Sequence, residues 1–180
     1  MDNNKVIIMN FDTESKSFQA FSEIKRLHNE GKITGEQMAV LEHRVNHNLE
    51  PKDFIDFTGS DKNLKGSLIG ILIGILAGPL GVLLGWFTGS IIGTTKDAKE
   101  VQNALSIFEK VLNIIPEGET GLILICSEKT TGELDDVVIT KLNGKIERIS
   151  QKTVEKEIKE AQETQAETEE HAKKRWFSKT

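Results

Sequence analysis

The sequence predicts an α+β fold, a ferredoxin-like α/β sandwich that is interrupted by a glycine-zipper helical hairpin and followed by a charged helix. Strand-like apolar runs and helical stripes alternate in the order β-α-β-β, then α-β-α-β. Between these halves, glycine recurs every four residues in an uncharged apolar stretch. We therefore divide the chain into a first half-domain (1–60), a hairpin (61–96), a second half-domain (97–151) and a charged helical tail with a basic-aromatic end (152–180).

The first half-domain begins with a strand at residues 6–11, because Val6 to Met9 is a continuous apolar run. A helix follows, since Asp12, Thr13 and Ser15 are residue types that cap helices. Gly31 ends this helix. Its apolar stripe consists of Phe18, Phe21, Ile24 and Leu27.

Residues 37–45 fit two interpretations. Thr34 and Gln37 have the spacing of a capping box, with Met38, Leu41 and Val45 as a helical stripe. The alternation of Ala39, Leu41, His43 and Val45 also suits a strand. We favour the strand, because residues 46–48 are typical of a turn and residues 54–57 resemble a hairpin partner.

The second half-domain opens with a helix over residues 101–115, whose apolar residues recur with a period near 3.6. Pro116 and Gly118 end it. Residues 120–126 form a continuous apolar strand. Thr130 and Glu133 have the spacing of a capping box and predict a helix that Gly144 ends. Residues 145–149 alternate as an edge strand does.

The glycine-rich segment predicts close helix packing. A period of four places the glycines on one helix face, where a second backbone can approach closely. The predicted helix-packing residues are Gly66, Gly70, Gly74, Gly78, Gly81, Gly85, Gly89 and Gly93.

The break in the glycine period, at Pro79, leaves the topology of this segment open. Each half is about 20 Å long, which is shorter than the roughly 30 Å of a bilayer core. One kinked span of about 28 residues is one option. A hairpin that turns at Pro79 is the other, and we favour it because it returns both half-domains to one side, where they build one sheet. Burial against the protein's own sheet or a partner chain is the third.

The tail beyond Thr153 is charged and has few apolar residues, so it predicts a solvated helix or partial disorder. Its end combines cations with two aromatic rings, as interfacial membrane anchors do. A plain solvated tail is the alternative. The predicted membrane-interface residues are Lys173, Lys174, Arg175, Trp176 and Phe177.

No residue pattern predicts catalysis. His43 and His47 have a metal-site spacing but no evident third ligand. Asp135 and Asp136 suit the first turn of a helix better than acid–base work. Cys126 lies in an apolar strand and has no positioned base. We therefore predict a non-enzyme without a catalytic, cofactor-binding or metal residue, and no small-molecule substrate is identified. The net charge of −5 disfavours nucleic acid as a partner.

Two stretches of the chain carry a family resemblance. The glycine run at residues 66–85, with its central Gly-Pro, and the strand at residues 117–124 make the chain similar to domain-of-unknown-function family 1269. This family is a group of predicted bacterial membrane proteins, and the resemblance covers roughly residues 5–150. It implies no catalytic residue and no substrate.

The predicted function is that of a non-enzymatic, membrane-associated protein. It self-associates through its glycine helices and has a structural, envelope or stress role. Membrane lipid and further copies of the chain are the predicted partners. The predicted location is the cytoplasmic membrane of a bacterium, with the α/β domain and both termini facing the cytoplasm. A small pore-forming or membrane-perturbing assembly and a soluble oligomeric binding module are the alternatives.

Overall fold

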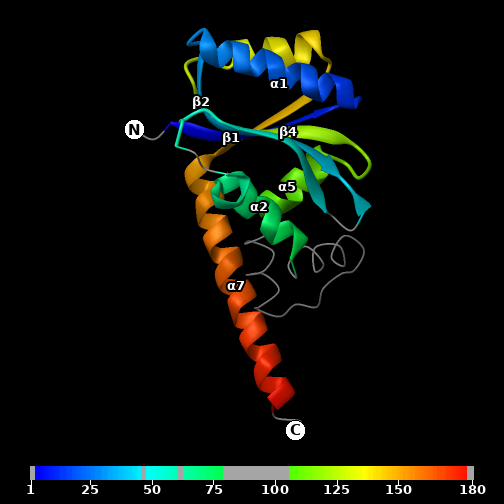
Figure 1. The fold of residues 1–180 in the computed structure, drawn as a ribbon, viewed down its shortest axis with the longest axis vertical. Coiled ribbons are helices and arrows are strands. Elements are labelled where there is room, and N and C mark those ends of the chain that lie inside the picture. Colours follow the sequence, from blue (N-terminus) through cyan, green and yellow to red (C-terminus); the bar gives the residue numbers. More distant parts are fainter. Residues whose placement is uncertain (1–2, 46–47, 61–62, 79–105, 178–180) are drawn as a thin grey trace.

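A five-stranded antiparallel sheet lies between two helical layers in the computed structural model, which describes residues 3–45, 48–60, 63–78 and 106–177 (Figure 1). The strands are β1 (Asn4–Phe11), β2 (Ile33–His43), β3 (Leu49–Asp56), β4 (Thr120–Glu128) and β5 (Lys145–Ser150). The helix α1 (Glu14–Asn29), one-turn α6 (Gly132–Asp135) and the π-helix η3 (Asp136–Lys141) cover one face. The other face carries α2 (Leu68–Ala77), α5 (Ser106–Ile114) and the first part of α7 (Gln151–Phe177), and the short η2 (Leu64–Gly66) precedes α2.

The strand order is β3-β2-β4-β1-β5, and every neighbouring pair is antiparallel. The central strand β4 therefore lies between β1 and β2, and it pairs Leu124 with Ile7 of β1. This arrangement confirms the α+β class.

The strands β1 and β4 are buried on both faces of the sheet, which explains their continuous apolar runs. Because side chains alternate along a strand, Ile7 and Leu124 face the α1 layer. Ile8 and Ile123 face the layer of α2, α5 and α7. Each helical layer thus has its own core, and the sheet separates the two.

The strand interpretation of residues 37–45 is confirmed by β2, which pairs with β3 as a hairpin. The edge strand β3 is longer than predicted and contains Pro51, which lies opposite Leu41 where the pairing register shifts. An edge strand tolerates proline because its outer N–H groups need no partner. The predicted helix before β2 is also confirmed, as α1. Thr13 caps this helix by accepting a hydrogen bond from the Lys16 N–H, and Gly31 follows it with φ of 71°.

The capping box at Thr130 and Glu133 is wrong. The helix starts at Gly132, and the N-cap residue Thr131 makes no side-chain capping bond. After one turn the backbone widens into η3, which ends before Asn143 with its positive φ of 53°. The tail, in contrast, is a single helix from Gln151 to Phe177.

The prediction of a membrane protein with a transmembrane helix is wrong. Along the described ranges of the chain, no helix has both the length and the apolar character needed to cross a bilayer. The apolar helix α2 has ten residues and lies on the sheet of its own domain, where it buries Ile69, Leu72 and Leu76. An apolar run of this length is typical of a core helix. The predicted location in the cytoplasmic membrane is therefore not supported, and the orientation of the termini relative to that membrane falls with it. The predicted turn at Pro79 and the second glycine run, 81–93, lie outside the described residues.

Candidate interaction surface

The helix α2 has one buried side and one exposed side. Its start is fixed by Ser67, whose hydroxyl accepts a hydrogen bond of 3.0 Å from the Gly70 N–H. The apolar side chains of the buried side, including Ile69 and Leu72, pack in the core beneath the sheet. On the other side Gly74 and Ala77 are exposed. At Gly74 and Ala77 this side of α2 therefore presents backbone and one methyl group, next to the half-buried side chain of Ile71.

The described glycines within and next to α2 differ in how closely other atoms approach them. A β-carbon on Gly70 would lie 1.7 Å from the carbonyl oxygen of Leu64, so this glycine serves packing within the chain. A β-carbon on Gly74 would meet no heavy atom of the described residues within 4 Å. Within the same described part of the chain, a β-carbon on Gly66 would meet the Asn63 side chain alone, at 3.8 Å. The predicted helix-packing stripe is thus not uniform.

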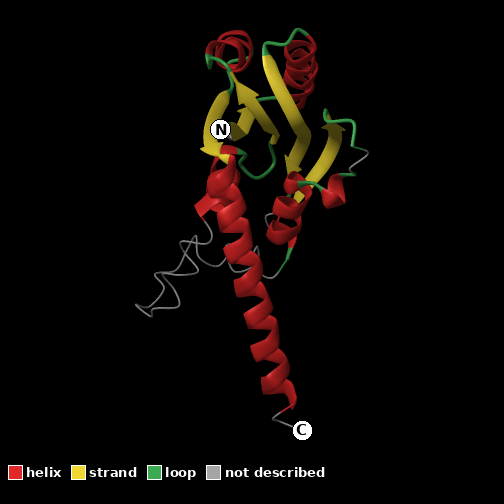
Figure 2. Ribbon diagram, turned by 90° about the vertical axis from the view of Figure 1, so that its left-hand side faces the viewer, coloured by secondary structure: helices red, strands yellow, loops and turns green. Residues whose placement is uncertain are grey.

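The helix α7 borders this surface. Its first part is buried through Val154, Ile158 and Ala161, at the spacing of one helix face. The amide nitrogen of Gln165 lies 3.5 Å from the β-carbon position of Gly78, at the end of α2. Beyond that point α7 leaves the body of the domain (Figure 2). The neighbouring α5 is tied to the same helix, because Glu157 accepts a hydrogen bond of 2.8 Å from the Ile107 N–H.

The basic-aromatic end that the sequence singled out forms the last turns of α7, through Phe177. Among Lys173, Lys174, Arg175, Trp176 and Phe177, the structure describes only the side chain of Lys174. It is exposed and forms an ion pair of 2.8 Å with Glu170. Nothing in the structure tests a contact of this end with lipid. Gly81, Gly85, Gly89 and Gly93 lie outside the described residues.

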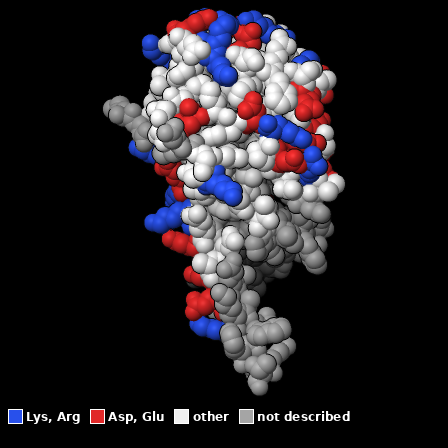
Figure 3. All heavy atoms as spheres, viewed as in Figure 1, with Lys and Arg blue, Asp and Glu red and all other residues white. Residues whose placement is uncertain are grey.

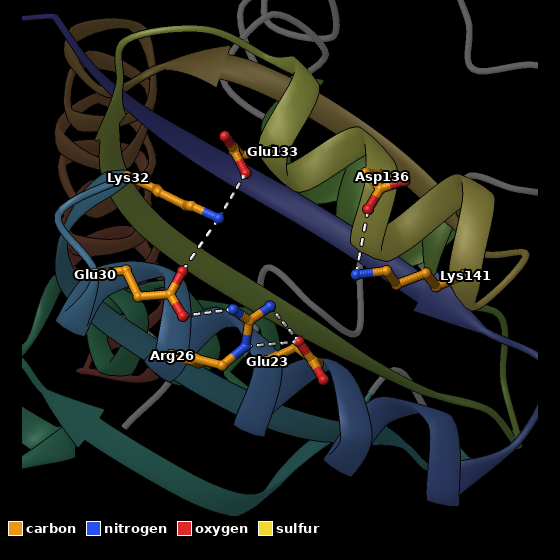
Figure 4. A network of polar contacts seen from close by, with 7 residues as sticks. All are labelled: Glu23, Arg26, Glu30, Lys32, Glu133, Asp136 and Lys141. Carbon is orange, nitrogen blue, oxygen red and sulfur yellow. Dashed lines mark hydrogen bonds and ion pairs between the residues drawn. The ribbon is translucent and has the colours of Figure 1, made fainter.

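The opposite helical layer carries a chain of ion pairs across its surface (Figure 4). Arg26 of α1 pairs with Glu23 and Glu30, and Lys32 pairs with Glu30 at 3.1 Å and with Glu133 of α6 at 3.5 Å. Hydrogen bonding to Glu23 raises the pKa of Arg26, and hydrogen bonding to Arg26 lowers the pKa of Glu30. Such exposed pairs contribute little to stability. On the face of the domain that Figure 3 shows, the positive and negative charges of the described residues are interspersed.

Sequence analysis missed a buried ion pair between β4 and β5. The Glu128 side chain is 1% exposed, and it accepts two hydrogen bonds from Arg148, at 2.8 and 3.0 Å. This bidentate pairing raises the pKa of Arg148. Arg148 also contacts Asp135 of α6 at 2.9 Å, and Lys5 lies 3.9 Å from Glu128. The pair connects the edge strand to the sheet and to the helix above it.

An open depression of about 370 Å³ at the end of β2 was also not predicted. Its lining includes Glu42, Arg44 and Glu117. Arg44 and Glu42 form an ion pair of 3.3 Å, and Lys52 lies 2.6 Å from the same carboxylate. Glu42, Arg44 and Lys52 therefore already pair with one another at the depression.

The candidate chemical groups have structural positions. His43 is buried, and its Nδ1 atom bonds to the backbone carbonyl of Ile115, while His47 is outside the described residues. Among the described residues, no group of three metal-ligating side chains occurs. Asp135 pairs with Arg148, whereas Asp136 pairs with Lys141. The two carboxylates therefore do not act as one acid–base pair.

Burial in the sheet raises the pKa of the Cys126 thiol from 9.0 to about 12. At a pH between the two pKa values, the thiol is ionised in the unfolded chain and protonated in the folded chain. Rising pH therefore favours the unfolded state. We expect the wild-type protein to lose on the order of 2 kcal/mol more unfolding free energy than Cys126→Ala between pH 8 and pH 10.5. Urea titrations of both proteins at the two pH values measure this difference. Equal losses would show that the thiol titrates normally in the folded state.

Comparison of the chain with protein-family models, with curated proteins and with solved structures finds no match. The case for a function therefore has to come from the surface itself.

Proposed function

We propose that this chain is a non-enzymatic protein that self-associates through the exposed side of α2. The observation that carries the proposal is Gly74, which is exposed on an otherwise apolar helix and whose side-chain position meets no atom of the described residues within 4 Å. Ala77 continues this side by one turn. A second α2 can approach such a surface until the backbones are close, so that packing contacts extend over both helices.

The roles of the titratable groups support a non-enzymatic function. His43 and Cys126 are buried in the core, and Asp135 and Asp136 are engaged in ion pairs. These four side chains thus have structural explanations. Their placement favours a structural or binding role, and a contact between identical surfaces gives the closed symmetry that most homo-oligomers have.

The test replaces Gly74 by glutamine, a long and polar side chain. Gly74→Gln fills the space that a second helix would use, and it adds no apolar surface. Because no atom of the described residues lies within 4 Å of the new β-carbon and glutamine favours helices more than glycine does, we expect the monomer to gain stability. We expect the variant to sediment as a smaller species than the wild type and to melt at a higher temperature.

Ser22→Gln is the matched control, since it adds the same side chain at an exposed position of α1 in the other layer. It should sediment as the wild type does. If Gly74→Gln and the wild type give the same concentration dependence in sedimentation velocity, self-association through α2 is wrong.

We also propose that the sheet is ferredoxin-like with one added strand. The order β5-β1-β4-β2, all antiparallel, with α1 and α6 on one face, supports this interpretation. The edge strand β3 is then the addition, and residues 61–96 are an insertion between it and α5. Membership of domain-of-unknown-function family 1269 stays a prediction from the glycine run and its surroundings.

A further inference from the structure

The C-terminal part of α7 extends away from the sheet as an arm, defined here as residues 162–177 (Figures 1 and 2). Among the described side chains of α7, Ala161 is the last buried one, and Glu163, Glu167 and Glu170 are exposed. At 1.5 Å per residue the arm is about 24 Å long. Most helical stability in proteins comes from packing of one face, and none of the described side chains of the arm is buried. A partner helix along the arm would therefore stabilise it.

The charges of the arm are separated along its length. Glu163, Glu167, Glu169 and Glu170 form an acidic part without a cation among them. Lys173, Lys174 and Arg175 follow as a basic part. Within the arm the described side chains include one ion pair, between Glu170 and Lys174. Glutamates four residues apart, as at 163 and 167, repel each other on a helix. Negative charge therefore predominates in the first part of the arm, and positive charge predominates towards its end.

We infer that the arm binds the arm of a second copy of this chain, with the two helices antiparallel. In that arrangement the acidic part of each helix lies beside the basic part of the other, and a two-fold axis passes near residue 170. A parallel pair would place glutamates beside glutamates. One helix therefore carries both halves of a complementary charge pattern, which identifies a second copy as the occupant rather than a partner of a single charge sign.

The spacing along α7 provides a seam for this contact. Val154, Ile158 and Ala161 occupy positions that alternate between four and three residues, as in a coiled coil. Beyond Gln165, whose side chain lies against the end of α2, the sequence positions that continue this spacing hold Thr168 and Ala172, neither of which is charged. The charged positions flank that seam, where ion pairs between helices select the partner and its direction.

This inference rests on the proposed function in that it names a second surface for the same self-association. A chain with two self-complementary surfaces assembles beyond a dimer. Removing either surface then leaves a dimer that the other one holds together, and removing both leaves a monomer. The two contacts can therefore fail independently, because Gly74→Gln acts on α2 alone.

The test exchanges charges on the full-length chain. One variant carries Lys173→Glu, Lys174→Glu and Arg175→Glu, and the other carries Glu163→Lys, Glu167→Lys and Glu170→Lys. Both are made in the Gly74→Gln background, so that only the arms can associate. Each variant alone should associate at least about tenfold more weakly than the background protein, because like charges now meet. An equimolar mixture of the two should recover the association.

Three results would overturn the inference. Association of either variant as strong as that of the background protein excludes the charged parts as the contact. A mixture that fails to recover association, although circular dichroism shows both variants folded, excludes antiparallel pairing. A Gly74→Gln protein that is monomeric at every concentration leaves α2 as the sole contact and rejects the arm. If instead Gly74→Gln assembles as the wild type does while the charge variants dissociate, the arm stands and the contact through α2 fails.

Cross-linking determines the direction of the helices. In a Cys126→Ala background, one protein carries Glu163→Cys and another carries Phe177→Cys. These positions are symmetric about residue 170, so mixed disulfides between the two proteins should form faster than disulfides between identical chains. Faster formation of the 177–177 disulfide would establish a parallel pair and reject the arrangement.

Discussion

Arg148→Met is expected to lower the free energy of unfolding by about 3 kcal/mol, a value typical of a broken buried ion pair. The Glu128 side chain is 1% exposed, and Arg148 supplies both of its close hydrogen bonds. Without the guanidinium, the carboxylate stays buried with Lys5 as its nearest cation, at 3.9 Å. Asp135 also loses its contact, so α6 is held less firmly. Urea unfolding followed by circular dichroism measures the loss.

Two further variants separate the pair from general effects. Lys110→Met removes a cation of α5 that pairs with Glu147, which lies on β5 beside Arg148. Both side chains of this pair are about half exposed. That change should cost less than about 0.5 kcal/mol. Glu128→Gln combined with Arg148→Met should cost clearly less than the sum of the two single changes, since the double variant leaves no charge uncompensated. Additive costs, or a cost of Arg148→Met equal to that of Lys110→Met, would contradict a buried ion pair.

Alanine at Gly70 and alanine at Gly74 are expected to have effects of opposite sign, although the two residues are one turn apart on α2. The β-carbon at position 70 would lie 1.7 Å from the Leu64 carbonyl oxygen and 2.7 Å from its carbon. Backbone cannot yield as a side chain does, so the start of α2 must shift. We expect Gly70→Ala to lower the free energy of unfolding by about 2 kcal/mol or more.

Gly74→Ala serves as the internal control for this effect. It brings the same gain in helix propensity, and its β-carbon enters open space. It should therefore raise the free energy of unfolding by about 0.5–1 kcal/mol. Thermal melts at a low protein concentration, where association contributes least, compare the two variants. If both changes stabilise the protein, the close approach of Leu64 to Gly70 is not present in solution.

The sequence allowed the central part of the fold to be predicted, because the constraint there is local. The strands β1 and β4 are buried on both faces, so each reads as an unbroken apolar run. The helix α1 is indicated by a periodic apolar stripe, by a cap at Thr13 and by a glycine at position 31. By contrast, the π geometry of η3 follows from packing of Val137 and Val138 into the core, and a capping pattern gives no information about it.

The membrane interpretation failed because hydropathy does not say which surface an apolar helix faces. Residues 68–77 satisfy a lipid environment and a sheet equally well, and the sheet that covers them is assembled from distant segments. The length of the helix was the available signal, since ten residues suit a core helix better than a span. The pair of Glu128 and Arg148 was equally hidden. Its members are 20 residues apart, and only the register of β1 with both β4 and β5 brings them together.

The position of β4 in the sheet has a consequence for how the chain is made. Because β4 lies between β1 and β2, these two strands have no direct pairing with each other, and both wait for a segment that begins more than one hundred residues after β1 ends. At ribosomal rates of about 5–20 residues per second, that interval is roughly 5–20 s. Until then, the edge of β1 at Ile7 and the edge of β2 at Val40 lack the strand that pairs with them in the native sheet. A nascent chain that stops before Thr120 can form the β2–β3 hairpin but not the five-stranded sheet, so the folding of this domain is a late, cooperative event.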